Sequence, residues 1–396
     1  MTVRVTHNRY SFMVVAGCIV ALSTAACGSS GTTPAASAKA SSPTSSPVNS
    51  GLAYAKAQVA KYSGAIELPS VPAIANPVDL KGKTVWFIPI TNSVLSLSGM
   101  GTTMAAALSH MGASVHVCDG QALPTTIANC MTTASQQGAA AVVTAFVDYA
   151  MVPTAFKALE AKNIPVLVAG ETPPAGVTPS ADLQFLDAAN VTNLGDVTSA
   201  FVAIAASGGK GDIMVIKLTD SPAVLEASNE EISALTKYCS ACKVNSISMN
   251  TANIAQLPSQ LSAALVDHPN TNYILVPNDG FVPPVMGAVT SSGFTSKVKV
   301  IAFGAGVAGL QEVKAGTLAY DVGGPIEYTG WEFANAVIRM MSGLTVQPEP
   351  AGPQRIFDSS NVQPLSLTTT NYLNTSFYQV SQSAFEAPFL AAWKAS

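Results

Sequence analysis

Charged residues and histidine are scarce in this chain. Lysine, arginine, aspartate and glutamate make up 11% of its 396 residues, acids outnumber bases by 23 to 19, and there are four histidines. We expect no nucleic-acid partner, because proteins that bind nucleic acid normally carry a basic patch or stripe. His110, His116 and His268 support no Ser/His/Asp or Cys/His arrangement, and the acids show no paired-carboxylate spacing, so an ordinary set of catalytic residues is lacking.

The start of the chain lacks an apolar run long enough for a permanent membrane anchor. The run at residues 12–22 is about half of the ~20 apolar residues that a transmembrane helix needs. It follows Arg4 and Arg9 and leads into small residues that end at Cys27. This layout is typical of an export signal, so we expect residues 1–26 to be a signal peptide and the mature protein to work outside the cytoplasm.

The residues around Cys27 resemble a bacterial lipoprotein cleavage site, whose cysteine becomes the lipidated first residue. The resemblance implies a diacyl anchor on the outer face of the cytoplasmic membrane, because two acyl chains hold a protein far more firmly than one. Thr24 stands where that pattern usually has leucine, so ordinary cleavage before Cys27 is the alternative. Residues 27–50 are predicted to be a disordered tether, since Gly, Ser, Thr, Pro and Ala bury too little apolar surface to order a segment.

Four cysteines lie beyond Cys27, and we predict two disulfides, Cys118–Cys130 and Cys239–Cys242, because an exported protein meets oxidising conditions. A redox or metal site is the alternative for the second pair. No histidine follows Cys242, and the pair ends a predicted helix instead of starting one, which disfavours that alternative.

Hydrophobic residues make up 48% of the chain, enough for two buried cores in the region after the tether. From residue 81 onward, short β-branched runs alternate with longer helical stretches. The predicted strands are 84–89, 114–118, 140–145, 165–169, 213–217, 244–248, 273–277, 298–303 and 318–322. The predicted helices lie near 98–111, 125–137, 151–162, 191–206, 222–238, 255–266, 283–292 and 329–342. Strict alternation predicts an α/β fold of parallel sheets flanked by helices, and the proline-rich stretch 171–187 is interpreted as a lobe boundary.

Two regions of the chain resemble the type I periplasmic binding proteins. They are 136–170, with an Asn-Ile-Pro-Val run at 163–166, and 268–318, with Pro-Asn-Asp at 277–279. The likeness is to the ribose-binding-like branch that delivers ligands to ABC importers. It implies two Rossmann-like lobes hinged by three crossings, with the ligand held between them. The implied divisions are an N-terminal helical extension at 51–79, lobe 1 at 80–186 and 324–350, and lobe 2 at 187–323 and 351–396.

The resemblance also implies where the ligand binds, and here the sequence departs from the sugar-binding pattern. Asn92 keeps the family's asparagine after the first strand, but the two stacking aromatics beside it are missing. The family's arginines fall on Glu171 and Glu226, and one of its aspartates falls on Gly304. An anion would be repelled in such a desolvated cleft, so we expect a sugar-like, polyol-like or cationic ligand. The candidate contacts are Asn92, Ser93, Asp148, Tyr149, Glu171, Glu226, Asn278, Asp279, Phe281 and Gly304.

Several of these residues also have purely structural interpretations. Asn92 and Asp148 are candidates for helix caps, and Asn278 with Asp279 for a turn. Tyr149 and Phe281 are candidates for core or rim positions.

A glycine motif supports a different class of function. Gly304, Gly306 and Gly309 match the G-x-G-x-x-G fingerprint of dinucleotide-binding folds, but the motif comes late in the series of strands. We expect no cofactor and no enzyme. The predicted function is a monomeric extracytoplasmic binding protein that serves an ABC permease and its cytoplasmic ATPase. The alternative is a ligand-sensing receptor for a membrane kinase.

Overall fold

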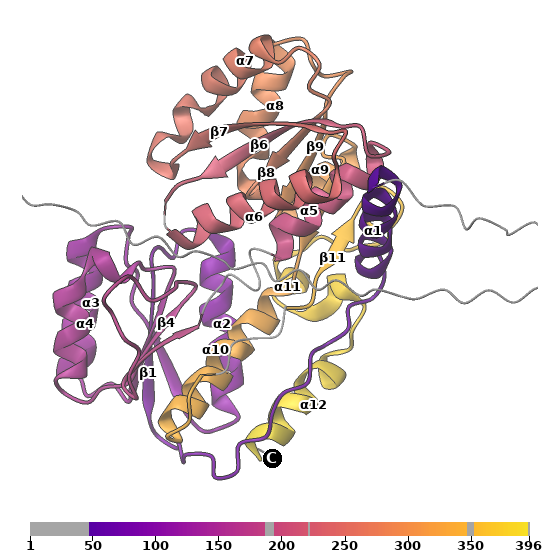
Figure 1. Cartoon of the computed structure of the whole chain (residues 1–396). Helices are drawn as coiled ribbons and strands as arrows, with labels where there is room; N and C mark the ends of the chain where they lie inside the picture. Colours follow the sequence, from indigo (N-terminus) through magenta and orange to yellow (C-terminus); the bar gives the residue numbers. More distant parts are fainter. Residues whose placement is uncertain (1–46, 187–193, 221, 347–351, 395–396) are drawn as a thin grey trace, which may run out of the picture. The chain divides into compact units, whose positions relative to one another are not determined.

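The computed structural model describes residues 47–186, 194–220, 222–346 and 352–394 (Figure 1). They belong to one compact unit, and the predicted signal, Cys27 and most of the predicted tether lie outside the described residues. The first helix, α1 (Pro47–Tyr62), begins inside the predicted tether, before its predicted end at residue 50. Proline suits the first turn of a helix because the N–H that it lacks would have no partner there.

The first lobe is built on a parallel sheet with the strand order β2-β1-β3-β4-β5. Its strands are β1 (Thr84–Pro89), β2 (Ser114–Val117), β3 (Ala141–Ala145), β4 (Val166–Ala169) and β5 (Leu183–Leu186). Val85 and Phe87 of β1 belong to one buried cluster and Trp86 and Ile88 to another, because alternate residues of a strand point to opposite faces. The covering helices are α2 (Leu95–Ser109) and α10 (Ile326–Met341) on one face, and α3 (Pro124–Gln136) and α4 (Pro153–Glu160) on the other (Figure 1).

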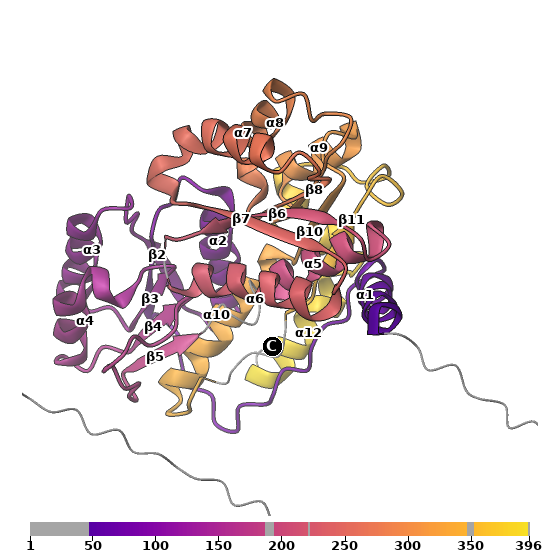
Figure 2. The ribbon, with the colours of Figure 1, turned by 45° about the horizontal axis from the view of Figure 1, so that its top comes forward.

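The second lobe is built on a sheet with the order β11-β10-β9-β8-β6-β7, in which only β11 runs antiparallel to its neighbour among the described pairs. Its strands are β6 (Asp212–Leu218), β7 (Lys243–Met249), β8 (Tyr273–Val276), β9 (Lys299–Phe303), β10 (Tyr320–Gly323) and β11 (Arg355–Phe357). Figure 2 shows its helices on both sides of the sheet. They are α5 (Leu194–Ala206) and α6 (Pro222–Tyr238) on one side, and α7 (Leu257–Asp267), α8 (Val282–Ser291) and α9 (Val307–Ala315) on the other.

The chain passes between the two lobes three times: after β5, between β10 and α10, and between α10 and β11. The second and third passages lie in contact. A Cβ placed on Gly324 would lie 2.6 Å from the carbonyl oxygen of Pro353, and the hydroxyl of Tyr378 donates a hydrogen bond of 2.8 Å to the Gly324 carbonyl. The predicted fold class of two α/β lobes joined by three crossings is confirmed.

The end of the described chain packs onto the first lobe. Helix α12 (Gln382–Trp393) follows α11 (Thr369–Tyr372) and a short 3-10 helix at Thr375–Tyr378. The ring of Trp393 stacks on Trp331 of α10 with centroids 5.5 Å apart, and its Nε1 donates to Asn335 Oδ1 at 3.0 Å. The predicted division assigns residues 351–396 to lobe 2, whereas α12 packs on α10 of the first lobe. The exact lobe boundaries stay a proposal.

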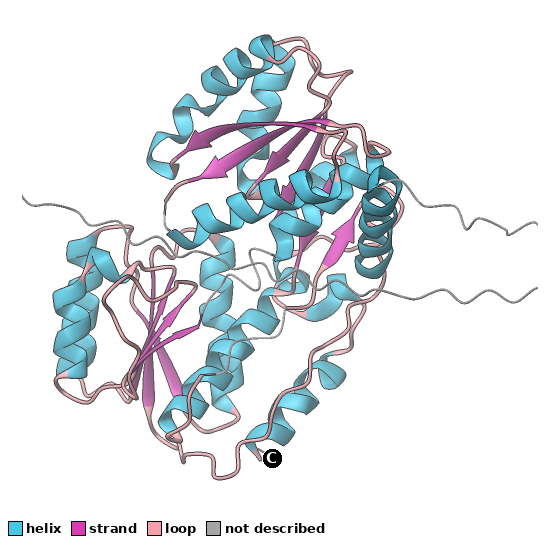
Figure 3. Ribbon diagram, in the orientation of Figure 1, coloured by secondary structure: helices cyan, strands magenta, loops and turns pink. Residues whose placement is uncertain are grey.

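All nine predicted strands are present with ends shifted by no more than two residues, and Figure 3 shows how they alternate with helices. Two strands escape prediction. β5 is four residues long and follows the three prolines of the 171–187 stretch, and β11 has three residues. Both predicted disulfides form, Cys118–Cys130 with Cα atoms 5.9 Å apart and Cys239–Cys242 with Cα atoms 5.3 Å apart. Within the described ranges, no helix combines the length and the apolar character that crossing a bilayer requires.

Candidate functional site

A cavity of about 740 Å³ lies between the lobes. Its wall comes largely from residues that follow the carboxyl ends of the strands, where parallel α/β sheets bind ligands. The first lobe contributes Phe146 after β3, Gly170 after β4 and Leu186 at the end of β5. The second lobe contributes Leu218 at the end of β6 and the segments after β8 and β9. Both sheets therefore direct their ligand-binding edges to one space.

Four of the predicted contacts line this cavity, namely Asn278, Asp279, Phe281 and Gly304. The three that follow β8 are held by a local turn. Asn278 Oδ1 accepts a hydrogen bond of 2.9 Å from the N–H of Gly280 and so begins the 3-10 helix at Asp279–Phe281. Asn278 thus forms the expected turn and also lies on the cavity wall, while its contact with a ligand stays a prediction.

Asp279 is the only acidic or basic residue among the described lining residues. Its Oδ2 accepts a hydrogen bond of 2.7 Å from the N–H of Gly306 in the glycine-rich loop. The pKa of the Asp279 carboxyl is raised overall because burial outweighs the backbone N–H groups of Gly306, Gly280 and Gly309, which lower it. The loop thus stabilises the carboxylate form.

A second carboxyl, Asp321 of β10, is fully buried behind the same loop and accepts a hydrogen bond of 3.0 Å from the N–H of Ala305. Burial raises the pKa of Asp321 well above its ordinary value, and the negative charge of Asp279 raises it further. Two nearby carboxyls in such a place do not both ionise readily. Asp321 is therefore the acid of this pair that keeps its proton.

The glycine motif is explained by these two acids. A Cβ on Gly304 or Gly306 would lie 2.7 Å from a carboxylate oxygen of Asp279, and a Cβ on Gly309 would overlap both Asp279 and Asp321. The fingerprint binds dinucleotides when its glycines let the backbone approach a pyrophosphate. Here side-chain carboxyls occupy that place and use the N–H groups, so the described residues do not fit a pyrophosphate.

Two predicted pairs lie outside the lining. Asn92 and Ser93 are exposed; the N–H of Asn92 donates to Asp119 Oδ1 at 2.8 Å, and Val94 is the residue that precedes α2, so Asn92 does not cap that helix. Asp148 caps the 3-10 helix at Tyr149–Met151 by accepting from the N–H of Ala150 at 2.9 Å.

Tyr149 is buried, and its ring stacks on Phe156 with centroids 4.8 Å apart, within the core between sheet and helices. Phe146, three residues earlier, lines the cavity instead. Glu171 is buried directly after the lining residue Gly170, and Glu226 is exposed on α6. Ligand contact stays a prediction for all ten residues, those in the lining included.

The apolar part of the wall was missed by the sequence interpretation. It includes residues at the starts of α2 and α10, at strand ends and at the crossings, among them Val94, Leu95, Leu97, Met100, Phe146, Leu186, Phe303, Val307, Ile326, Phe333, Pro353 and Tyr372. For Phe146 and Phe303, the ends of the predicted strands 140–145 and 298–303 are the signal that could have identified them. Burial raises the pKa of Tyr372, and the neighbouring acid Asp279 raises it further, so its phenol stays protonated and can donate a hydrogen bond.

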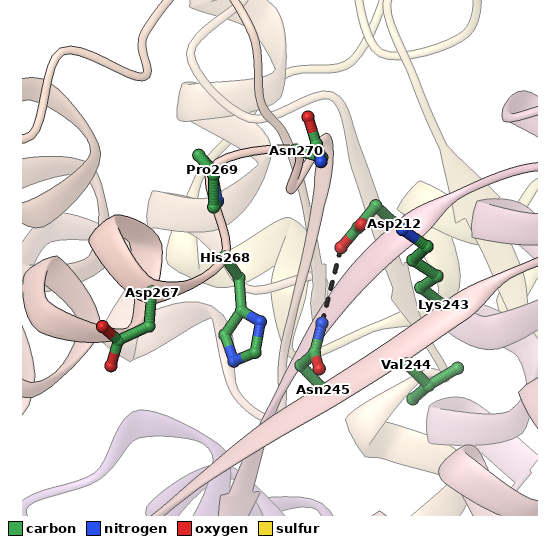
Figure 4. A pocket seen from close by; sticks show the side chains of 8 residues that line it. All are labelled: Asp212, Lys243, Val244, Asn245, Asp267, His268, Pro269 and Asn270. Carbon is green, nitrogen blue, oxygen red and sulfur yellow. Dashed lines mark hydrogen bonds between the residues drawn. The ribbon is translucent and has the colours of Figure 1, made fainter.

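A second hollow of about 470 Å³ lies at the amino ends of β6 and β7 (Figure 4). It is polar, and within it Asn245 Nδ2 donates to Asp212 Oδ1 at 3.4 Å. It lies at the opposite edge of the second sheet from the cavity, where parallel sheets do not usually bind ligands.

The comparisons with known proteins agree with this geometry. The family model described as "Periplasmic binding protein domain" matches residues 85–345. Among solved structures, a periplasmic solute-binding protein of an ABC transporter from Actinobacillus succinogenes, with bound D-allose, has a TM-score of 0.60 at 15% identity and covers 72% of this chain and 100% of its own. The glucose-galactose binding protein of Geobacillus stearothermophilus has a TM-score of 0.62 at 14% identity, with coverages of 72% and 100%.

A 5-methylthioribose transporter solute-binding protein from Thermotoga lettingae, in complex with 5-methylthioribose, has a TM-score of 0.60 at 11% identity and covers 79% of this chain and 98% of its own. At these identities the structures show a shared fold. No curated protein sequence matches the chain.

Proposed function

We propose, because the chain belongs to the periplasmic binding protein family, that it is the extracytoplasmic binding component of an ABC importer for a small sugar-like solute. The observation that carries this proposal is the cavity of about 740 Å³ whose wall comes from both lobes. A ligand that touches both walls binds more tightly when the lobes approach each other. It therefore shifts the population toward a closed form, which docks on the permease above its ATPase.

The charges of the cavity lining and the proposed location of the protein are both compatible with import of an uncharged solute. The described lining has no basic side chain to attract an anion, and its single carboxylate already accepts an N–H. An uncharged solute therefore suits the cavity better than a dicarboxylate. Structures of similar fold hold D-allose and 5-methylthioribose, which supports a sugar-like solute. Export by residues 1–26 and lipidation of Cys27 would keep the protein at the outer face of the membrane.

A thermal-shift screen of the mature protein against neutral sugars, polyols, amines and dicarboxylates tests the proposal. A ligand at 100 times its Kd adds about 2.7 kcal/mol to the free energy of unfolding, so a true solute raises the Tm measurably. We expect the largest shift from an uncharged sugar-like compound. Tight binding of a dicarboxylate, or turnover of the bound compound, would refute the proposal.

The exposed lining residue Gln311 provides a matched pair of variants for titration calorimetry. Gln311→Ala should weaken binding of the solute, because an amide that can hydrogen-bond a hydroxyl is lost. Gln260→Ala, at an exposed position of α7 outside the lining, should leave the affinity unchanged. Deletion of the gene should abolish uptake of the same solute, which distinguishes an importer from a sensory receptor.

A further inference from the structure

The two walls of the cavity differ in chemistry. The described wall of the first lobe has Ser96, Tyr328 and Thr329 as its polar side chains. The rest of it is mostly apolar and is formed chiefly at the starts of α2 and α10 by Val94, Leu95, Leu97, Met100, Ile326 and Phe333. The second lobe places Thr251, Asn278, Asp279 and Gln311 at the cavity beside apolar side chains such as Phe281 and Phe303. Apolar side chains therefore predominate on the first-lobe wall, and the one charged side chain of the described lining, Asp279, belongs to the second lobe.

A free hexose does not match such a cavity. Its hydroxyl groups point in all directions, so those facing the apolar side chains of α2 and α10 would lose water and find few partners besides Ser96, Tyr328 and Thr329, which is costly for a buried polar group. An apolar substituent in the same place would gain from leaving water instead. The contrast between the walls thus favours a ligand with two chemically different ends.

The charges of the described lining also favour an uncharged ligand. Asp279 is the one charged side chain in the described lining, and Gly306 already donates a 2.7 Å hydrogen bond to it. Its remaining acceptor capacity suits a hydroxyl donor, and the phenol of Tyr372 offers a second polar contact at the same end.

We propose that the solute is an uncharged sugar-like molecule that carries an apolar substituent, such as an aryl or alkyl glycoside. Its hydroxyls contact Asn278, Asp279 and Gln311, and its substituent packs against the starts of α2 and α10. This inference rests on the proposed function and narrows the class of solute.

Calorimetric titration of the mature protein with paired probes tests the inference. The pairs are the phenyl β-glycosides of glucose, galactose and xylose, each against its free sugar. Adding even one methylene in an apolar pocket changes affinity by about tenfold or more, so at least one phenyl glycoside should bind at least about tenfold more tightly than its parent sugar.

The chain offers a matched control for the apolar wall. Val94 and Leu95 line the cavity and are 43% and 41% exposed, while Val117 and Leu123 lie outside the lining and are 42% and 51% exposed. The variant Val94→Ser/Leu95→Ser should remove most of the preference for the phenyl glycoside. The variant Val117→Ser/Leu123→Ser should keep it.

The possible results separate the two proposals. A free sugar that binds as tightly as its phenyl glycoside overturns the inference and leaves the importer function standing. A preference for the phenyl form that survives in Val94→Ser/Leu95→Ser overturns the assignment of the substituent to this wall. If no member of the panel binds in either form, the inference and the sugar-importer function both fail.

Discussion

Two pairs of buried acids in the second lobe show how differently a protein can hold carboxyl groups. At the cavity, Asp279 and Asp321 each accept a backbone N–H from the glycine-rich loop. Between α5 and α6, Asp196 and Glu231 are each 3% exposed; burial raises the pKa of Asp196 to about 8, and burial and then the charge of Asp196 raise that of Glu231. The first pair can present a carboxylate to a ligand, whereas the second is stable in its protonated form.

The pH dependence of stability should reveal the second pair most clearly. The folded-state pKa of Asp196 is about 8, against an ordinary value near 4 in the unfolded chain, so its contribution is complete below about pH 4 and is lost as the pH rises to 8. Glu231 acts in the same direction. We expect the free energy of unfolding in urea to fall by about 2–4 kcal/mol between pH 5 and pH 8.

Glu231→Gln should make that profile less steep, because glutamine resembles the protonated acid and cannot ionise, while the part of the slope that is due to Asp196 should remain. Glu230→Gln, at the exposed neighbouring position, should leave the slope as it is. A stability that stays constant or rises from pH 5 to 8 would contradict the assignment of the α5–α6 pair.

Gly309→Ala should disturb the first pair. The new methyl group would overlap the carboxyls of Asp279 and Asp321, and overpacking of this kind costs about 1–3 kcal/mol of stability. Gly287→Ala on α8 is the control, since a Cβ there meets nothing within 4 Å and should stabilise the helix by about 0.5–1 kcal/mol. Urea denaturation measures both, and equal stability of the two variants would mean that the loop does not hold the acids closely.

Asp321→Asn should have the smallest effect. Asparagine has nearly the shape of the protonated acid and can still accept the N–H of Ala305, so the free energy of unfolding at pH 7 should change by less than about 1 kcal/mol. A loss larger than about 2 kcal/mol would show that Asp321 is ionised in the folded protein and that its charge is required.

Much of the fold could be predicted because local patterns specify it. The predicted strand 84–89 matches β1, since its β-branched and aromatic residues favour a strand. The disulfides could be predicted because the two cysteines of each pair are close in sequence. β5 and β11 could not be predicted, because strands of four and three residues are defined by their neighbours in the sheet and not by their own periodicity.

Lining residues of the cavity were predicted best where their position depends only on the end of one strand. Asn278 and Asp279 come after β8 and Pro277, and both line the cavity. Ile326 and Phe333 of α10 resemble ordinary core residues in the sequence, since their place at the cavity depends on how the chain passes between the lobes. The function of the glycine motif was ambiguous for a similar reason. The glycines make room for Asp279 and Asp321, and neither acid belongs to the motif itself.

Gly324 packs closely against Pro353, so there is no room for a side chain between the second and third passages. A fluorescent protein inserted into either passage would therefore distort both, and with them the lobe closure that the proposed function requires. An optical biosensor made from this protein should carry its dye on an outer helix, for example at a cysteine that replaces Val266 of α7, which is 71% exposed.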